Sequence, residues 1–370
     1  MLNIKKTGSE TFPSTENLFQ TSFWGKVKSA SGQKALYFWV DWQTEKCLEY
    51  FPLLVLLRKT SEKSQYAYIP RGPFVKVEVE ERGLLLEELS EKLKEFLPQN
   101  CSHIRFDVPW KINSSEKVDS TRLELLELKM NFGTKNHNLR KASLGHLCAN
   151  TVIIDLSLPP EKMLEKMRGT TRNSIRRSYK SEVDFTIYHE WNTETQIALK
   201  EWYSLYVGTA KRKDFFYDNY EYFERLFNSR EDIQSEKIAF NIPLTASVPP
   251  PNFYLFTATK NKMLLSGLIL AVVSKSAYYM YAASSLEERE CMPNYGLQWE
   301  VMRFARSLGC TQYDLMGIPP NNNKNHPMAG LFIFKTGFGG NKIRFAGAWD
   351  YILDKEKYIS FKNQESLYKA

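Results

Sequence analysis

The chain has 370 residues, of which 43% are hydrophobic and 25% charged, as is usual for a globular protein. This length favours two domains of about 100–200 residues each over a single hydrophobic core. The formal net charge of +8 indicates a polyanionic partner, such as nucleic acid, a nucleotide-bearing substrate or an anionic membrane surface.

The five cysteines and five histidines are scattered along the chain, and neither set has the spacing of a metal site. We therefore expect reduced thiols and no metal. The N-terminus lacks the apolar core of a signal peptide, and no apolar run reaches the ~18–20 residues of a membrane span. These patterns predict a cytoplasmic protein, for which peripheral contact with a membrane surface stays open.

The first part of the chain alternates between strand-like and helix-like segments. A helix is expected at 16–28, and an amphipathic helix at 84–96 carries Leu85, Leu89 and Leu93 on one face. The expected strands are 35–42, 53–58, 66–69 and 103–108. This alternation predicts one α/β unit over residues 1–149.

A second unit begins at residue 150. Pro159 and Pro160 open an expected helix that runs to Lys180, because proline suits the first turn of a helix. The other expected elements are strand 151–156, strand 185–188, helices 194–207 and 220–227, an extended loop at 241–252, strands 253–259, 264–273 and 277–282, helix 294–308, and strands 313–316 and 345–353. This order is close to that of an N-acetyltransferase-like domain, and it suggests that the first unit is a degenerate copy.

The expected helix after Pro160 carries arginines at positions i, i+4 and i+8, namely Arg168, Arg172 and Arg176. They would form a cationic stripe along one face. Few acidic residues neutralise this stripe, so it either contacts phosphate groups or is a solvated helix face.

Lys335 lies within an apolar, aromatic run at 332–340 and is followed by glycines. Such a lysine either extends its ammonium to the surface or is held in a site. The glycines would allow a ligand to approach the backbone closely. Together with the strand at 313–316 and the polar loop at 319–326, the run is interpreted as the wall of a cleft.

Several common catalytic patterns are missing from the sequence. There is no G-x-S-x-G motif and no recognisable cysteine nucleophile, so a covalent acyl-enzyme is not expected. The glycine-rich motifs that bind phosphate groups are missing as well. An acetyl-CoA-dependent acetyltransferase carries glycines before the helix that follows its central strand. Residues 289–296 (RECMPNYG) do not have that pattern, which argues against coenzyme A.

Short motifs that follow one another over nearly the whole chain carry a family resemblance. They are the segments 22–28, 68 with 71–73, 104–107, 167–177, 221–223, 279–282, 313–318, 334–340 and 347–350. In this order they resemble the Fem family, the non-ribosomal aminoacyltransferases that build peptidoglycan side bridges.

The resemblance implies an α/β fold with two N-acetyltransferase-like domains. The first domain would comprise residues 1–149 and be completed by residues 346–370, and the second would comprise residues 150–345. It implies an amino acid donated by aminoacyl-tRNA, without a further cofactor. The acceptor would be an amine on the stem peptide of UDP-MurNAc-pentapeptide or of a lipid-linked peptidoglycan precursor.

The same resemblance implies roles for individual residues. Lys26 and Tyr222 would hold the nucleotide-sugar or pyrophosphate end of the precursor, and Tyr279 and Tyr281 would join that site. An arginine common before the Glu-Tyr-Phe motif is replaced here by Asp218, so precursor recognition is expected to differ. Arg212 is the nearest candidate substitute.

Two residues are candidates for catalysis. Lys335 would face the tRNA acceptor end and stabilise developing negative charge. Asp107 would lie near the reacting amine and accept its proton, although an aspartate close to Pro109 is also typical of a turn.

Three other functions stay open at this point. They are an acyl-CoA-dependent N-acyltransferase, an aminoacyl-tRNA–protein transferase, and a non-enzymatic module that binds RNA or a wall precursor. The long helical arm of some Fem proteins is not expected, because no segment of ~50 residues has the heptad pattern.

Overall fold

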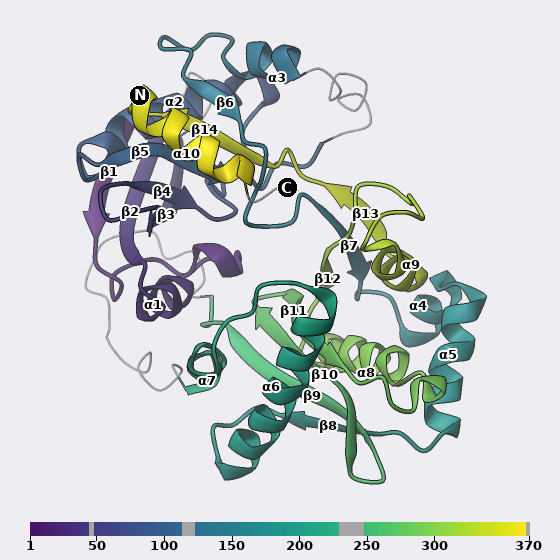
Figure 1. Cartoon of the computed structure of the whole chain (residues 1–370). Coiled ribbons are helices and arrows are strands. Elements are labelled where there is room, and N and C mark those ends of the chain that lie inside the picture. Colours follow the sequence, from purple (N-terminus) through teal and green to yellow (C-terminus); the bar gives the residue numbers. More distant parts are fainter. Residues whose placement is uncertain (44–47, 113–122, 229–247, 368–370) are drawn as a thin grey trace. The chain divides into compact units, whose positions relative to one another are not determined.

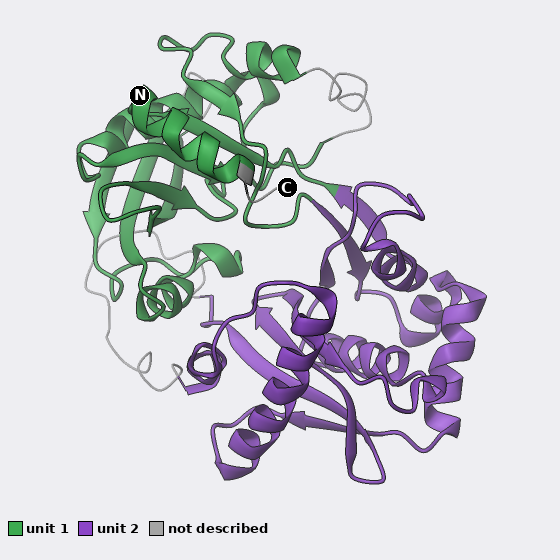
Figure 2. Cartoon of the chain, in the orientation of Figure 1, with its two compact units in different colours: residues 1–149, 344–370 green, residues 150–343 purple. Residues whose placement is uncertain are grey.

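The computed structural model describes residues 1–43, 48–112, 123–228 and 248–367. The chain divides into two compact units (Figure 2), one formed by Met1–Ala149 with Arg344–Ala370 and the other by Asn150–Ile343. Relative to the expected domains, residues 344 and 345 belong to the first unit. Among the described residues, no helix is long and apolar enough to cross a membrane.

The first unit is built on a mixed sheet (Figure 1) with the strand order β1-β2-β3-β4-β5-β14-β6. The strands are β1 (Leu2–Thr7), β2 (Lys34–Gln43), β3 (Leu48–Lys59), β4 (Gln65–Ile69), β5 (Cys101–Asp107), β6 (Leu139–Lys141) and β14 (Ala348–Ile352). Strands β4 and β5 are parallel, whereas their neighbours in the sheet pair antiparallel.

The two faces of this sheet differ in chemistry, because side chains alternate along each strand. Ile104 and Phe106 of β5 join the hydrophobic core under α2, in which Leu85, Leu89 and Leu93 are fully buried as predicted. The helices of the unit are α1 (Ser22–Ala30), α2 (Arg82–Lys94), α3 (Leu123–Met130) and α10 (Lys355–Leu367). The opposite face presents aromatic and charged residues toward α10.

The second unit has a sheet with the order β13-β7-β12-β11-β10-β9-β8. Its strands are β7 (Asn150–Asp155), β8 (Asp184–Tyr188), β9 (Asn252–Lys260), β10 (Met263–Val273), β11 (Ser276–Ser284), β12 (Gln312–Gly317) and β13 (Asn341–Arg344). Its helices are α4 (Pro160–Lys166), α5 (Gly169–Lys180), α6 (Thr193–Lys213), α7 (Tyr220–Asn228), α8 (Pro293–Ser307) and α9 (Ala329–Gly337). The predicted α/β class with mixed sheets is therefore confirmed.

Several element boundaries differ from the expected ones for local reasons. The helix expected at 16–28 starts only at Ser22, because Asn17 first caps a short 3-10 turn at Leu18–Gln20 and Thr21 then caps α1. The expected helix from Pro160 to Lys180 is interrupted at Met167 and Arg168, whose backbones are extended. Most of the loop expected at 241–252 lies outside the described residues.

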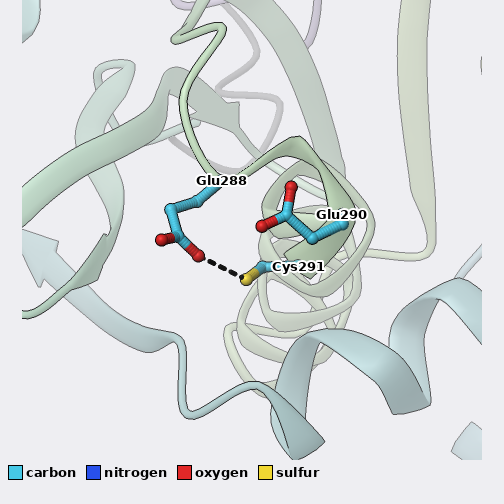
Figure 3. Close-up of side chains that lie close together, drawn as sticks. All are labelled: Glu288, Glu290 and Cys291. Carbon is cyan, nitrogen blue, oxygen red and sulfur yellow. Dashed lines mark hydrogen bonds between the residues drawn. The ribbon is translucent and has the colours of Figure 1, made fainter.

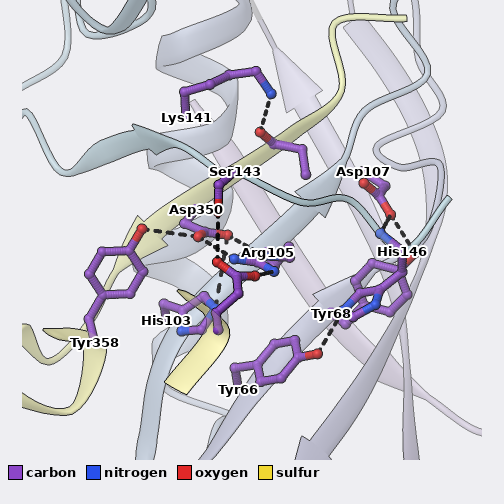
Figure 4. Close-up of polar contacts among 12 residues, drawn as sticks. Tyr66, Tyr68, His103, Arg105, Asp107, Lys141, Ser143, His146, Asp350 and Tyr358 are labelled. Atoms are coloured by element: carbon purple, nitrogen blue, oxygen red, sulfur yellow. Dashed lines mark hydrogen bonds and ion pairs between the residues drawn. The ribbon is translucent and has the colours of Figure 1, made fainter. Parts of the chain in front are cut away.

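The return of the chain to the first unit depends on a buried ion pair (Figure 4). Arg105 of β5 donates to both carboxylate oxygens of Asp350 on β14, each at 2.7 Å, and also to Glu365 of α10. Tyr358 of α10 donates to Asp350 at 3.0 Å. Although burial opposes ionisation, hydrogen bonds from Arg105 and Lys362 lower the pKa of Glu365 to about 2.

Replacing Arg105 by methionine is expected to lower the free energy of unfolding by about 3–5 kcal/mol at pH 7, because the buried Asp350 loses its cationic partner and Glu365 keeps only Lys362. Urea denaturation measures the change. The pKa of Glu365 is lower in the folded chain than in the unfolded chain. The stabilisation is therefore present above pH ~4.5 and is lost as the pH falls toward 2. Lys162→Met, which breaks an exposed pair with Glu165, should leave the stability unchanged. Equal effects of the two substitutions would contradict this account.

Candidate functional site

In the second unit, the two parallel strands at the middle of the sheet separate. Strands β11 and β12 pair from Ser276 opposite Gln312 to Tyr278 opposite Asp314, and their pairing stops there although both strands continue. Near the end of β12, Met316 has a φ of 56°, a left-handed conformation that is uncommon for a residue other than glycine. Such local distortion is frequent where strands line a functional site.

Lys335 lies at this separation. Its side chain extends from the last turn of α9, is only 5% exposed, and donates to the carbonyl oxygen of Gly317 at the end of β12 over 2.9 Å. Its ammonium nitrogen is 5.1 Å from the centre of the Tyr279 ring on β11. The sequence left open whether the Lys335 ammonium extends to the surface or is held inside the protein. In the structure the side chain is buried and its ammonium is bonded to Gly317.

Tyr279 extends this network into the core. Its hydroxyl hydrogen-bonds with Gln298 of α8, whose side-chain oxygen also accepts from Tyr313 at 2.9 Å. Removal of the hydroxyl from water raises the pKa of Tyr279 to about 12, so the group stays protonated at neutral pH. Sequence reasoning missed Gln298, although a glutamine within the apolar face of a helix is a detectable signal.

The glycines after Lys335 allow close packing within the protein. A Cβ atom at Gly337 would lie 2.5 Å from the Thr171 hydroxyl, and one at Gly340 would lie 2.7 Å from the Ile153 carbonyl. At Gly339, which has a φ of 81°, a Cβ would meet the carbonyl oxygen of Lys166. The approach of a ligand to this backbone stays a prediction.

The family resemblance implied that Tyr279 and Tyr281 share one site. The structure separates them with a β-bulge: Tyr279 pairs with Leu270 and Tyr281 with Ile269, leaving Met280 as the extra residue. The bulge reverses the alternation of side chains. Tyr279 thus faces α8, whereas Tyr281 contacts residues of α6 and α7.

On that other face, Tyr222 and Tyr281 are brought together as predicted. Their hydroxyl oxygens are 2.7 Å apart, and Tyr222 of α7 is 1% exposed. Burial raises the pKa of Tyr222 above its usual value. Arg212, near the end of α6, donates to the carbonyl oxygen of Ser284 at the end of β11 over 2.8 Å. Tyr206, which sequence reasoning missed, completes the aromatic cluster.

The expected cationic stripe is divided by the break between α4 and α5. Arg168 precedes α5 and donates to Thr336 of α9 at 2.9 Å. Arg172 donates to the carbonyl oxygen of Met167 at 2.5 Å and so caps the end of α4. Arg176 is exposed and donates to Asn173 on its own helix at 3.0 Å. Arg168 and Arg172 thus bind the protein itself, and phosphate contact by these residues stays a prediction.

The first unit carries the two other candidates. Oδ2 of Asp107, at the end of β5, accepts hydrogen bonds from the Tyr68 hydroxyl at 2.6 Å and from the backbone amides of His146 and Leu147, each at 2.9 Å. Asp107 is 1% exposed and fixes the 144–147 loop (Figure 4). Lys26 is half-buried on α1. The proposed substrate contacts of both residues stay predictions.

One group of acidic and sulfur ligands converges among the described residues, formed by Glu288, Glu290 and Cys291 (Figure 3). The Lys260 ammonium already lies there, donating to Glu288 at 2.7 Å and lying 3.4 Å from the Cys291 sulfur. A lysine cation thus neutralises this group, and we assign no metal to it.

The Tyr222–Tyr281 contact can be measured with a double-mutant cycle. Tyr222→Phe and Tyr281→Phe should each cost about 0.5–1.5 kcal/mol of stability, because each removes the hydrogen bond between the two hydroxyls. The double variant should lose less than the sum of the two. Additive losses in urea denaturation would show that the two hydroxyls are not coupled.

Comparison with known proteins places these features in a family. Residues 9–240 and 254–365 match the model of the FemAB family. A protein named Lipid II:glycine glycyltransferase from Staphylococcus haemolyticus (strain JCSC1435) is 37% identical over 98 residues, which are 26% of this chain and 23% of that protein. A protein of the same name from Staphylococcus saprophyticus is 37% identical over 99 residues, which are 27% of this chain and 24% of that protein.

The alignments with these relatives therefore span about a quarter of their length. A crystal structure of FemX superimposes on this chain with a TM-score of 0.67 and 18% sequence identity. The alignment covers 96% of this chain and 99% of the FemX chain, so the two proteins share a fold. Because the family model extends over most of the sequence and the fold agrees with it, this chain belongs to the FemAB family.

Proposed function

We propose that this chain is an aminoacyltransferase that moves an amino acid from aminoacyl-tRNA to an amine of a lipid-linked peptidoglycan precursor. The observation that carries the proposal is the buried ammonium of Lys335 where β11 and β12 separate. Family membership and the names of the relatives, which are Lipid II:glycine glycyltransferases, support the reaction class and the lipid-linked acceptor.

The proposed reaction needs no covalent enzyme intermediate. The acceptor amine attacks the ester carbonyl of the aminoacyl group, an amide bond forms, and the ester bond to the 3′-oxygen of the terminal ribose breaks. The amine loses a proton and the leaving oxygen gains one, so no other reactant is consumed. Since the ester is already activated, the main task of the protein is to align two large substrates and to stabilise charge.

Lys335 is proposed to stabilise the negative charge that develops on the carbonyl oxygen or on the leaving ribose oxygen. A fixed cation is most effective where water is excluded, and the ammonium is both buried and held by Gly317. Tyr279 below it orients the ammonium through its ring face.

The Tyr222–Tyr281 pair and Arg212 of the second unit are proposed to contact the precursor. Precursor binding by Lys26 of the first unit is a separate proposal. For Asp107, proton transfer stays a prediction. The three hydrogen bonds on its Oδ2 support a positioning role for the loop at 144–147.

Lys335→Met should lower kcat for transfer by roughly 10²–10³, the cost of removing one fixed stabiliser of an oxyanion. The assay combines the protein with a pool of charged tRNA and a lipid-linked precursor and determines the mass of the product. Lys200→Met, which changes an exposed lysine on α6, should leave transfer unchanged. Full activity of Lys335→Met would refute the proposed role.

The same assay separates the alternatives. Product formation from an acyl-CoA, or on the N-terminus of a peptide in place of the precursor, would assign the chain to another class of acyltransferase. Precursor binding without any product would indicate a non-enzymatic module. A UDP-linked precursor used in place of the lipid-linked one tests the acceptor. The added mass identifies the amino acid.

A lipid-linked acceptor would require contact with a membrane surface, and the segment after α6 supports such contact. Lys211 and Lys213 are exposed at the end of α6, and Asp214 stops the helix in a left-handed conformation. Phe216 follows with an exposed fraction of 87%, whereas Phe215 is 41% exposed and contacts the Tyr206 ring at 5.9 Å. Exposed aromatic rings beside basic residues are typical of segments that insert at the surface of anionic lipid.

Vesicles test this contact directly. The protein should co-sediment with vesicles of phosphatidylglycerol and phosphatidylcholine more than with phosphatidylcholine alone, and Phe216→Ser should reduce this binding at least ~3-fold. Phe132→Ser removes a ring that is 76% exposed in the first unit and serves as the control. Equal losses in both variants would contradict a specific role for the α6–α7 segment.

A further inference from the structure

In the second unit, β12 lies between β11 and β7 (Figure 1), and its pairing with β7 is irregular. Asp314 of β12 lies opposite Ile153 of β7. The next residue of β12 to pair is Gly317, which lies opposite Thr151. Between these two pairs β12 has one residue more than β7, so it carries a β-bulge that includes the left-handed Met316. The backbone of β12 therefore bends directly before Gly317.

Two polar side chains hold this bulge. Oδ1 of Asp314 accepts from the backbone amide of Met316 at 2.7 Å, which is a local turn closed by a carboxylate. The hydroxyl of Thr151, a fully buried residue of β7, donates to the same oxygen and lies 3.2 Å from the carbonyl oxygen of Met316. The amide and the carbonyl of Met316 are thus both in contact with the Thr151–Asp314 pair.

The conformation of Met316 determines where the Gly317 carbonyl points. A left-handed backbone is unfavourable for a residue with a Cβ atom, and it persists only where the surroundings fix it. Without the Thr151–Asp314 pair we expect Met316 to relax toward an extended conformation, which would turn the backbone at Gly317. Its carbonyl oxygen, which accepts from the Lys335 ammonium at 2.9 Å, would then face elsewhere.

We propose that Thr151 and Asp314 are positioning residues that set the place of the Lys335 ammonium through the Gly317 carbonyl. Neither residue is assigned a contact with the substrates. The effect of the pair on catalysis rests on the transfer reaction proposed above, whereas its effect on the ammonium does not. Alignment makes a large contribution to such a reaction, so a small displacement of the cation is expected to be costly.

Competitive labelling tests the placement of the ammonium without any substrate. The full chain is treated with a trace of acetic anhydride, and peptide mass spectrometry gives the acetylation rate of Lys335 relative to the exposed Lys200. Thr151→Val keeps the shape of the side chain and removes the hydroxyl. It should raise the relative rate at Lys335 ~10-fold, the factor expected for the loss of a hydrogen bond to a charged group.

Changes at Asp314 provide a second variant and a rescue. Asp314→Ala should raise the labelling of Lys335 as Thr151→Val does. Asp314→Asn should not, because the amide oxygen of asparagine can accept the same two hydrogen bonds. Unchanged labelling of Lys335 in either Thr151→Val or Asp314→Ala would overturn the proposal.

Asp155 offers a matched control at the other end of β7. Its Oδ1 also accepts from a backbone amide two residues ahead, that of Ser157 at 3.0 Å, and from the Ser157 hydroxyl. Asp155→Ala therefore removes a turn of the same kind and should leave the labelling of Lys335 unchanged. An equal rise in this control would show a general loosening of the sheet and would also overturn the proposal.

The transfer assay tests the catalytic effect. Thr151→Val and Asp314→Ala should lower kcat ~10–100-fold, since misplacement by about 1 Å costs up to ~10²-fold. The KM values of both substrates should stay unchanged, because the lost alignment acts in the transition state, and Asp314→Asn should restore kcat. A raised KM with normal kcat would indicate substrate binding and contradict positioning. Absence of product with the unaltered chain would refute the proposed function, while the labelling still decides the placement of Lys335.

Discussion

The buried ion pair between Arg105 and Asp350 joins residues that are 245 positions apart, and much of the first unit depends on it. A guanidinium in the interior is stable only with compensating charge and hydrogen bonds, which β14 and α10 supply together. The C-terminal segment therefore cannot leave the first unit without exposing an uncompensated cation. Arg105 also lies 5.9 Å from the Tyr66 ring, which stacks on His103, so the same interaction supports the aromatic contacts on this face of the sheet.

In the second unit, a single extra residue in β11 decides which side chains share a site. Without the bulge at Met280, Tyr279 and Tyr281 would point to the same face of the sheet. With it, Tyr279 lies under the Lys335 ammonium and Tyr281 pairs with Tyr222 on the opposite face. The bulge thus allows one strand to contribute to two separate groups of polar residues, at a place where the sheet is also opened by the separation of β11 and β12.

The sequence predicted the elements whose stability is local and missed those that depend on distant partners. The periodic leucines of α2 identify that helix directly. By contrast, α10 is polar, and its position depends on Glu365 reaching Arg105. The break before Arg168 also has no local signal, because it accommodates the close approach of Gly339 to Lys166. Likewise, Lys335 could be singled out from the sequence, but the bulge that divides the two tyrosines could not.

The space that the Lys335 side chain occupies does not by itself require a charged group. Burying an ammonium group costs free energy, which the Gly317 carbonyl and the Tyr279 ring face help to offset. An unbranched apolar side chain of similar length would fill the same space without this penalty. The glycines around it, in contrast, are needed for close packing on α4, α5 and β7. Of the features that make the 332–340 segment unusual, the lysine is therefore the one that the filling of space does not require, and it is the one for which we propose a chemical role.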